Sequence, residues 1–460
     1  MSLIDEKWEI LFEKYNIENE IKKNGLFYIT ADQIREVKEP RLMTKFDTKE
    51  SLPSVFGNKV SILPVTRGKY VLGEFDLYQE FPGVVSGIKQ MTSAKIPEFY
   101  ETIDINDIRS EAGAINVMSI AGILDDFLGE ENMVQTVSGR MGSGSFEFHV
   151  SDYKKSTLIG EKPNIIVQNS QVEIDGGFEN PNIFSIIEGK NVVYNNFLIR
   201  QLYYPTRLWG QKINKPIRPV FMVYSNNIFR LLEYEFTEIR YYNSIRLIQE
   251  RNYSLEDIEI TLEDLHDVWK KTIIKPEPNV TFIQADSFNK VISLVENLNE
   301  NPMTTGEIAE LLGFKERQSD YYYNACKYLG LAEKCSDEDG VKVHITDFGR
   351  KLLKMKYKER QLEYVRLILE HHIFNELFGI ALQRGEVPDK NCVMAKMKEL
   401  SVCGDNLIDR RSSSVRGWLY WVLAFERFWR EILNLQFQEI KGSMYGKKNN
   451  GKNYWVILYI

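Results

Sequence analysis

Val172-Glu-Ile-Asp-Gly-Gly177 and Phe184-Ser-Ile-Ile-Glu-Gly-Lys190 are the two stretches that decide the fold of this 460-residue chain. Each is a short apolar run that ends in glycine and charged residues, which is the pattern of a buried strand. The polar, proline-containing segment between them predicts a connecting loop. Side chains two residues apart on a strand point to the same side, so Glu188 and Lys190 share a face. With Asp175 expected at the end of the first strand, two carboxylates and one ammonium are predicted to meet in one cleft.

Helical and strand-like segments alternate around these two strands. The apolar residues of 108–128 recur at helical spacing. Further helices are expected at 5–15 and 195–203, further strands at 145–150, 164–167, 217–224 and 228–236, and a helix or connector at 241–250. This order favours an α/β or α+β core.

The length of the chain predicts two or three domains. Prolines and polar residues at 275–279 indicate a linker, beyond which short helices alternate with Gly and Asn turns. We therefore expect a first domain at 1–275, a second at 285–358 and a third at 359–460.

The combination of two acids and a lysine is the one that phosphodiester hydrolysis needs. Carboxylate oxygens hold Mg²⁺, which polarises the scissile phosphate and helps to generate hydroxide. A neighbouring lysine can orient or deprotonate the water and offset negative charge in the transition state. The alternative is that Asp175 belongs to a turn, with Glu188 and Lys190 as a solvated surface pair.

These residues resemble the signature of the PD-(D/E)XK nuclease superfamily, an Asp followed by (Asp/Glu)-x-Lys on the next strand. Asp175 matches the first acid and Glu188-Gly-Lys190 matches the triplet, although Ile174 stands where the superfamily often has proline. The resemblance implies a mixed sheet flanked by helices, with Asp175 and Glu188 as ligands of Mg²⁺.

Two further segments resemble a group of type II restriction endonucleases. Ser110-Glu-Ala-Gly-Ala-Ile-Asn116 places Glu111 where such enzymes carry a supporting metal-site acid. Asn196-Phe-Leu-Ile-Arg-Gln-Leu-Tyr-Tyr-Pro205 places Arg200 and Gln201 near the active site. The alternatives are a first-turn acid favoured by the helix dipole for Glu111, and an exposed helix face for the other two.

The glycine-rich stretch 137–143 is predicted to be a loop that brings Arg140 and main-chain N–H groups to a DNA backbone. It does not match the Walker pattern, so ATP-driven translocation is not expected. A plain surface loop is the alternative.

Met303-Thr-Thr-Gly-Glu-Ile-Ala-Glu-Leu-Leu-Gly-Phe314 has the character of a helix-turn-helix, with a threonine cap and a turn at Gly313. A following helix and the hairpin-like 341–345 segment resemble a winged helix. Its outer face is expected to present DNA-contacting side chains: Lys315, Arg317, Gln318, Ser319, Tyr321 and Asn324. Such modules also serve purely in protein interaction.

The segment Arg410-Arg-Ser-Ser-Ser-Val-Arg416 indicates a second unit of this kind. The serine run is expected to cap a helix, with Arg410, Arg411 and Arg416 placed for phosphate contacts. The alternative is a basic helix end that packs on the first unit.

Composition sets the remaining limits. The net charge of −7 argues against nonspecific coating of nucleic acid, whereas residues 301–460 hold 25 Lys/Arg against 21 Asp/Glu. The four cysteines lack metal-ligand spacing, so reduced thiols are expected rather than a zinc site. The sequence shows no signal peptide or membrane span, which predicts a cytoplasmic protein.

Together these features predict a Mg²⁺-dependent, sequence-specific endonuclease of double-stranded DNA, of the type II restriction class. Cutting both strands predicts a homodimer, and protection of host DNA predicts a cognate methyltransferase encoded nearby. One alternative is a nuclease that requires methylated DNA. The other is a non-enzymatic winged-helix regulator with a relic nuclease domain.

Overall fold

The computed structural model describes residues 3–425 except for 58, 83–87, 91–95, 97–98, 106, 153–162, 257 and 338–339. Contacts divide the chain into two compact units: residues 1–259 with 278–364, and residues 260–277 with 365–460. The helix-turn-helix segment therefore belongs to the same unit as the two motif strands. Of the predicted domain 359–460, only residues up to 425 are described.

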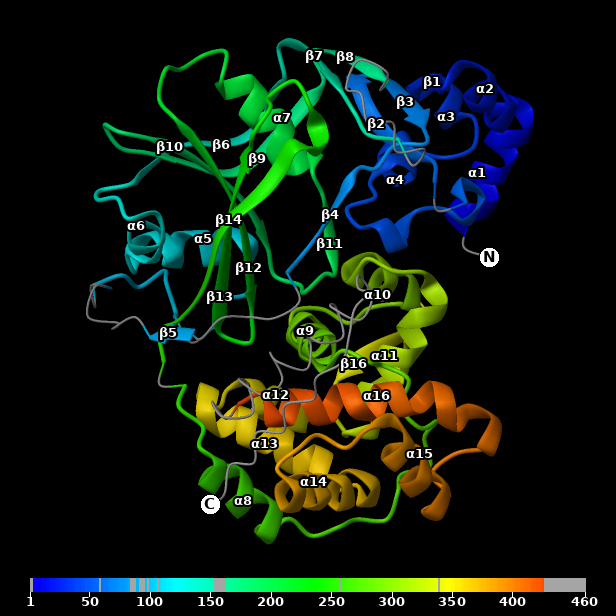
Figure 1. Cartoon of the computed structure of the whole chain (residues 1–460), viewed down its shortest axis with the longest axis vertical. Helices are drawn as coiled ribbons and strands as arrows, with labels where there is room; N and C mark the ends of the chain where they lie inside the picture. Colours follow the sequence, from blue (N-terminus) through cyan, green and yellow to red (C-terminus); the bar gives the residue numbers. More distant parts are fainter. Residues whose placement is uncertain are drawn as a thin grey trace, which may run out of the picture. The chain divides into compact units, whose positions relative to one another are not determined.

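A mixed seven-stranded sheet forms the centre of the first unit (Figure 1). Its order is β5 (Ile88–Gln90), β14 (Ile245–Ser254), β13 (Ile228–Phe236), β12 (Ile217–Ser225), β10 (Phe184–Lys190), β9 (Gln171–Glu179) and β6 (Val134–Gly142). The β10–β12 and β14–β5 pairs are parallel and the other pairs antiparallel. The expected mixture of helices and a mixed sheet is confirmed.

Helices cover the two faces of the motif strands. Helices α5 (Glu111–Ile120) and α6 (Ile123–Leu128) share a core with Ile187, whereas Tyr203 of α7 (Arg200–Trp209) shares another with Ile186. The alternation along β10 thus sends successive side chains into different cores. Gly189 lies on the α5 face, where an added Cβ would stand 3.3 Å from both Ile115 and Met222.

The first part of the chain forms a separate layer of the same unit. Its elements are α1 (Leu3–Lys14), α2 (Ile17–Asn24), α3 (Ala31–Arg35), α4 (Pro40–Thr44), η1 (Lys49–Ser51), η2 (Ser54–Phe56) and the sheet β1 (Leu26–Thr30), β3 (Lys69–Gly73), β2 (Ser61–Thr66). Trp8 is fully buried and donates its ring N–H to the Met43 carbonyl at 2.9 Å. Two small pairs complete the layer: β4 (Tyr78–Glu80) with β11 (Asn196–Leu198), and β7 (Ser145–His149) with β8 (Asn164–Gln168).

Three predicted local structures are wrong. Residues 195–203 form strand β11 followed by the start of α7 rather than one helix, and 241–250 contain a short 3-10 turn and most of β14. The predicted glycine-rich loop is the end of edge strand β6, because its backbone pairs with β9. Glycines there were mistaken for a loop signal, although an edge strand tolerates them.

The helix-turn-helix prediction agrees with the elements of 288–353. They are α9 (Phe288–Leu298), α10 (Thr305–Leu312), α11 (Glu316–Tyr328), the hairpin β15 (Ala332–Asp337) and β16 (Gly340–Ile345), and α12 (Asp347–Leu353). Gly313 makes the turn in the left-handed region, at φ 64°. Tyr322, Ala325 and Cys326 are buried, as the apolar spacing predicts.

Thr304 begins α10 with a reciprocal capping box. Its hydroxyl accepts from the Glu307 N–H at 3.2 Å, and the Glu307 carboxylate accepts from the Thr304 N–H at 2.8 Å. Thr304→Ala should therefore lower the free energy of unfolding by about 1 kcal/mol. Urea denaturation would measure it, with Thr305→Ala as the neighbouring control. An equal loss in both variants would show that the cap is not the cause.

The regular elements of the second unit, within its described residues 260–277 and 365–425, are helices. It contains α8 (Leu262–Lys271), the end of α13 (Tyr357–Leu369), α14 (His372–Arg384), α15 (Lys390–Glu399) and α16 (Asp405–Leu423). Gly379 of α14 lets the Trp269 ring approach, since an added Cβ would lie 2.9 Å from it.

The predicted helix cap in the serine run 412–414 is wrong. Helix α16 begins at Asp405 after Gly404, so the serines are internal, and Ser412 donates to the Asp409 carbonyl at 2.7 Å. Arg411 is buried, which contradicts its expected phosphate contact, whereas Arg410 is exposed.

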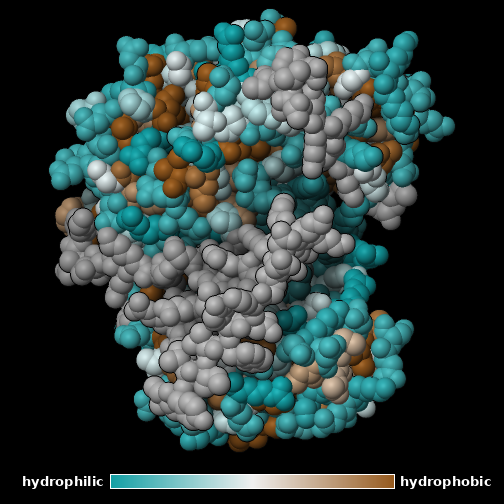
Figure 2. Space-filling model, viewed as in Figure 1, coloured by the Kyte–Doolittle hydropathy of each residue, from teal (hydrophilic) through white to brown (hydrophobic). Residues whose placement is uncertain are grey.

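The surface is mostly hydrophilic on the face drawn in Figure 2, where hydrophobic patches gather over the part that carries the large sheet. Leu247 and Ile248 of β14 are among the exposed apolar side chains. Within the described residues, no helix combines the length and the apolar composition needed to cross a bilayer.

Candidate active site

The site forms where β9 and β10 separate. Their pairing stops at Gly176 and Ile187, and beyond this point β10 pairs only with β12. Asp175 is inside β9 rather than at its end, because the strand continues through both glycines. The Gly189 N–H donates to the Asp175 carboxylate at 2.9 Å. This hydrogen bond takes the place of the backbone hydrogen bond that β9 no longer provides to β10.

Glu188 and Lys190 form the buried centre of the site. Their side chains lie on one side of β10, as predicted, and Lys190 Nζ donates to Glu188 Oε1 at 2.7 Å. Gln201 of α7 donates its amide to the same oxygen at 2.5 Å. The alternative of a solvated surface pair is therefore excluded, since the side chains of Lys190 and Glu188 are only 13% and 10% exposed.

Glu111 is the first residue of α5, and the start of this helix positions it near Lys190 and Asp175. Ser110 caps the helix by accepting from the Gly113 N–H at 3.0 Å, which fixes Glu111 in the first turn. Burial raises the pKa of its carboxyl, and the neighbouring charge of Asp175 adds to the rise. The Lys190 ammonium and the Asn191 backbone N–H oppose that rise, so Glu111 belongs to the same electrostatic cluster.

The cluster holds more acidic groups than basic ones. Burial raises the pKa of Glu188 to about 8, with Lys190 opposing the rise and Asp175 adding to it. Burial acts to lower the pKa of Lys190, but Glu188, Glu111 and further carboxylates outweigh it and raise the pKa well above its ordinary value. Lys190 is therefore a firmly protonated ammonium among several acids.

Asp47 is a member of the cluster that the sequence did not reveal. It lies after α4 in the first layer of the chain, and its carbonyl accepts from the Leu198 N–H at 3.1 Å, which ties this segment to β11. Its charge acts on both Glu188 and Lys190. Tyr194, four residues beyond Lys190, was also missed, although the same lysine and Asp47 act on its phenol.

The other predicted DNA contacts fall in different places. Arg140 on β6 pairs with Glu173 at 3.0 Å on an exposed edge. Arg200 lies over the Tyr204 ring at 5.7 Å, and its buried Nε has no hydrogen-bond partner among the described residues. Arg416 donates to the Tyr420 hydroxyl at 2.7 Å.

Of the six DNA contacts predicted on α11 and its N-cap residue, five are accessible and one is buried. Lys315 and Arg317 are exposed, and Gln318, Tyr321 and Asn324 are partly exposed. Ser319 is fully buried, so its predicted DNA contact is wrong. The helical repeat turns this residue inward, whereas its neighbours remain accessible.

The acidic side chains of the cluster do not form a ready-made metal site. In the described part of the chain, no group of three or more His, Cys, Asp or Glu side chains is arranged to hold a metal ion as it stands. One physical reason is that Glu188 Oε1 already accepts from both Lys190 and Gln201.

Three family models match successive parts of the chain. They are Domain of unknown function (DUF6996) at residues 5–72, Domain of unknown function (DUF6997) at residues 73–254, and Domain of unknown function (DUF7226) at residues 290–427. No curated protein and no solved structure matches the chain. The second model spans Glu111, Asp175, Glu188 and Lys190, while Asp47 falls within the first.

Proposed function

We propose that this protein is a Mg²⁺-dependent endonuclease that cuts double-stranded DNA at a specific sequence, as a type II restriction enzyme does. The observation that carries the proposal is the convergence of Asp175, Glu188 and Glu111 around the ammonium of Lys190 in one buried cluster. A lysine with a purely structural role needs only one carboxylate as its ion-pair partner. Several carboxylates act on Lys190, which is typical of a functional site.

The donor chemistry of these residues, though not their arrangement in this structure, suits a hard divalent cation. Every candidate ligand is a carboxylate, the donor that Mg²⁺ prefers. The raised pKa of Glu188 shows that Lys190 alone does not keep the cluster ionised. Gln201 Oε1 is also buried without a hydrogen-bond partner among the described residues. Asp175 and Glu188 would hold the ion, with Glu111 in support.

Bound Mg²⁺ would supply charge that polarises the scissile phosphate and acidifies an attacking water. Lys190 has a pKa raised well above normal, so it keeps its proton. This favours a charge-stabilising role over that of a general base: the ammonium donates to a phosphate oxygen or orients the water. Gln201 holds Glu188 in place, and Asp175 is fixed by the Gly189 N–H.

Sequence reading is assigned to the winged-helix segment. Lys315, Arg317 and Gln318 are accessible on the first turn of α11, which suits contacts to phosphates and base edges. A homodimer would bring two active sites to the two strands, and a cognate methyltransferase would protect host DNA. Localisation in the cytoplasm, where that DNA lies, belongs to the same proposal.

Incubation with bacteriophage DNA tests the proposal. Discrete fragments in Mg²⁺ that disappear with EDTA are the expected result, and sequencing their ends would give the recognition site. Gel shifts without cleavage in Mg²⁺ or Mn²⁺ would contradict the nuclease and favour the regulator. Cutting of methylated template alone would assign the protein to the methylation-dependent class.

Gln201→Ala should reduce the rate of DNA cleavage roughly 10-fold. The amide supports Glu188, and partners that hold metal ligands are typically worth about 10- to 100-fold in metal affinity or activity. Gln211→Ala is the matched control, because its amide donates to the Ser145 carbonyl at 3.1 Å outside the cluster. Initial rates on plasmid DNA would measure both variants, and equal rates would exclude Gln201 from the site.

A further inference from the structure

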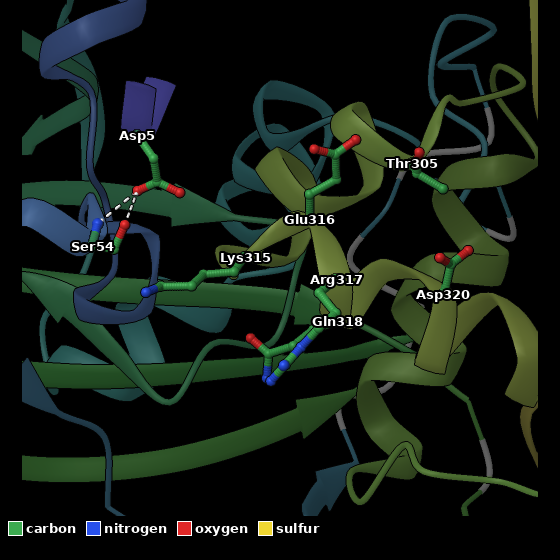
Figure 3. A pocket seen from close by; sticks show the side chains of 8 residues that line it. All are labelled: Asp5, Ser54, Thr305, Lys315, Glu316, Arg317, Gln318 and Asp320. Atoms are coloured by element: carbon green, nitrogen blue, oxygen red, sulfur yellow. Dashed lines mark hydrogen bonds between the residues drawn. The ribbon is translucent and has the colours of Figure 1, made fainter. Parts of the chain in front are cut away.

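A cleft of about 640 Å³ lies between the first layer of the chain and the helix-turn-helix. Asp5 of α1 and Ser54 of η2 form one wall, and residues of α10 and α11 form the other (Figure 3). Its complete lining is Asp5, Ser54, Thr305, Lys315, Glu316, Arg317, Gln318 and Asp320. This volume is in the range of sites that hold one nucleotide-sized ligand, and too small for both strands of a duplex.

The free polar groups of the cleft are mainly donors. Lys315, Arg317 and Gln318 extend from α11 to one side, whereas Glu316 and Asp320 point elsewhere (Figure 3). Neither cation has an ion-pair partner among the described residues.

Two acids of the lining are held by other groups. Asp5 accepts from the Ser54 N–H at 2.6 Å and from its hydroxyl at 2.9 Å, and Asp320 pairs with Lys334 at 2.9 Å. Glu316 is exposed and points away from the cations (Figure 3). The side of the cleft that carries Lys315, Arg317 and Gln318 therefore suits an anionic ligand that also offers hydrogen-bond acceptors.

Two hydrogen bonds tie the α10–α11 turn, which directly precedes the cations of the cleft, to residues next to the candidate active site. Thr48 donates to the Gly313 carbonyl at 2.6 Å, and Tyr194 donates to the Leu311 carbonyl at 2.8 Å. Thr48 directly follows the cluster member Asp47. Lys315 follows Gly313 by two residues, a reach of roughly 7 Å along the backbone. The cations of α11 and the acids around Lys190 are thus anchored to one another without a linker.

We propose that the cleft binds the DNA strand next to the scissile phosphate, and that cutting therefore falls within or directly beside the sequence that is read. Lys315 and Arg317 contact phosphates, and Gln318 contacts a base edge. This rests on the proposed nuclease function. A recognition module on a flexible linker would allow distant cuts, whereas the anchored α10–α11 turn fixes the distance.

The test compares the full-length chain with Lys315→Ala/Arg317→Ala and with a matched double variant, Lys327→Ala/Lys351→Ala. The control removes two exposed lysines from α11 and α12, outside the cleft. Fluorescence anisotropy measures binding to sheared bacteriophage DNA in EDTA over a range of salt concentrations. Sequencing of fragment ends made in Mg²⁺ maps the cuts, and thermal melts check folding.

The cleft variant should bind at least 10-fold more weakly, and its slope of log K against log salt should fall by about 2, since each phosphate contact contributes about 0.9. The control should lose much less. Cuts should lie at one fixed position within about 4 base pairs of the shared sequence. Equal losses in both variants, or cuts at a distance above about 8 base pairs, would overturn the inference. If the wild-type protein produced no fragment ends in Mg²⁺, the proposed nuclease function would be refuted instead. The comparison of DNA binding would still decide whether the cleft holds DNA.

Discussion

Replacing Lys190 by alanine should slow DNA cleavage by about 10³- to 10⁴-fold while leaving DNA binding within a few-fold of the wild type. The ammonium is the positive charge that the structure places among Glu188, Asp175 and Glu111. Removing one preorganised charge-stabilising group commonly costs about 10²- to 10³-fold, and the loss is larger where the group also positions the water. Conversion of supercoiled plasmid to nicked and linear forms in Mg²⁺ would measure the rate.

A loss of folding must be separated from a loss of chemistry. Lys190→Ala leaves the carboxyl of Glu188 buried, but with a pKa already raised to about 8 it can take up a proton at little cost. We therefore expect a cooperative melt. Lys22→Ala, which removes an exposed lysine paired with Glu18, is the control and should cut at the wild-type rate. Cleavage by Lys190→Ala within 10-fold of the wild type would exclude this lysine from the chemistry.

The strands of the site were predictable because local pattern and tertiary structure agree there. β10 and β13 match their predicted ranges to within one residue, since apolar runs of that length are buried in a sheet. The end of β9 was less predictable, because the strand was expected to end at Asp175 but runs through Gly176 and Gly177 to Glu179. Neither glycine has room for a Cβ, which would lie 2.7 Å from the Phe178 ring at Gly176 and 2.9 Å from the Phe184 ring at Gly177.

The missing members of the site could not be found from local patterns. Asp47 and Glu188 are brought together by a backbone bond from Leu198 to the Asp47 carbonyl, between strand β11 and a loop far away in sequence. The spacing of apolar residues along the sequence gives no information about such a long-range contact. Ser412 illustrates the opposite error, in which a good capping residue lies inside a helix that had begun earlier.

Gly313→Ala should lower the free energy of unfolding by about 2 to 4 kcal/mol. Its φ of +64° alone costs an alanine roughly 1 kcal/mol. In addition, the new Cβ would lie 2.7 Å from the Thr48 side chain and 3.1 Å from the Tyr194 ring. Thr48 is buried and branched, so it can move only by giving up its hydrogen bond to the Gly313 carbonyl.

Gly330→Ala is the matched control for this prediction. Gly330 has a similar φ of +71°, but nothing lies within 4 Å of its missing Cβ, so the variant reports the backbone cost alone. Urea denaturation of both variants separates the two contributions. The excess loss at Gly313 should shrink when Thr48→Ala removes the clashing atoms, as a double-mutant cycle would measure. Equal losses at Gly313 and Gly330 would mean that the turn is not held against the Asp47–Thr48 segment, and the fixed spacing between DNA reading and cutting would lose its physical basis.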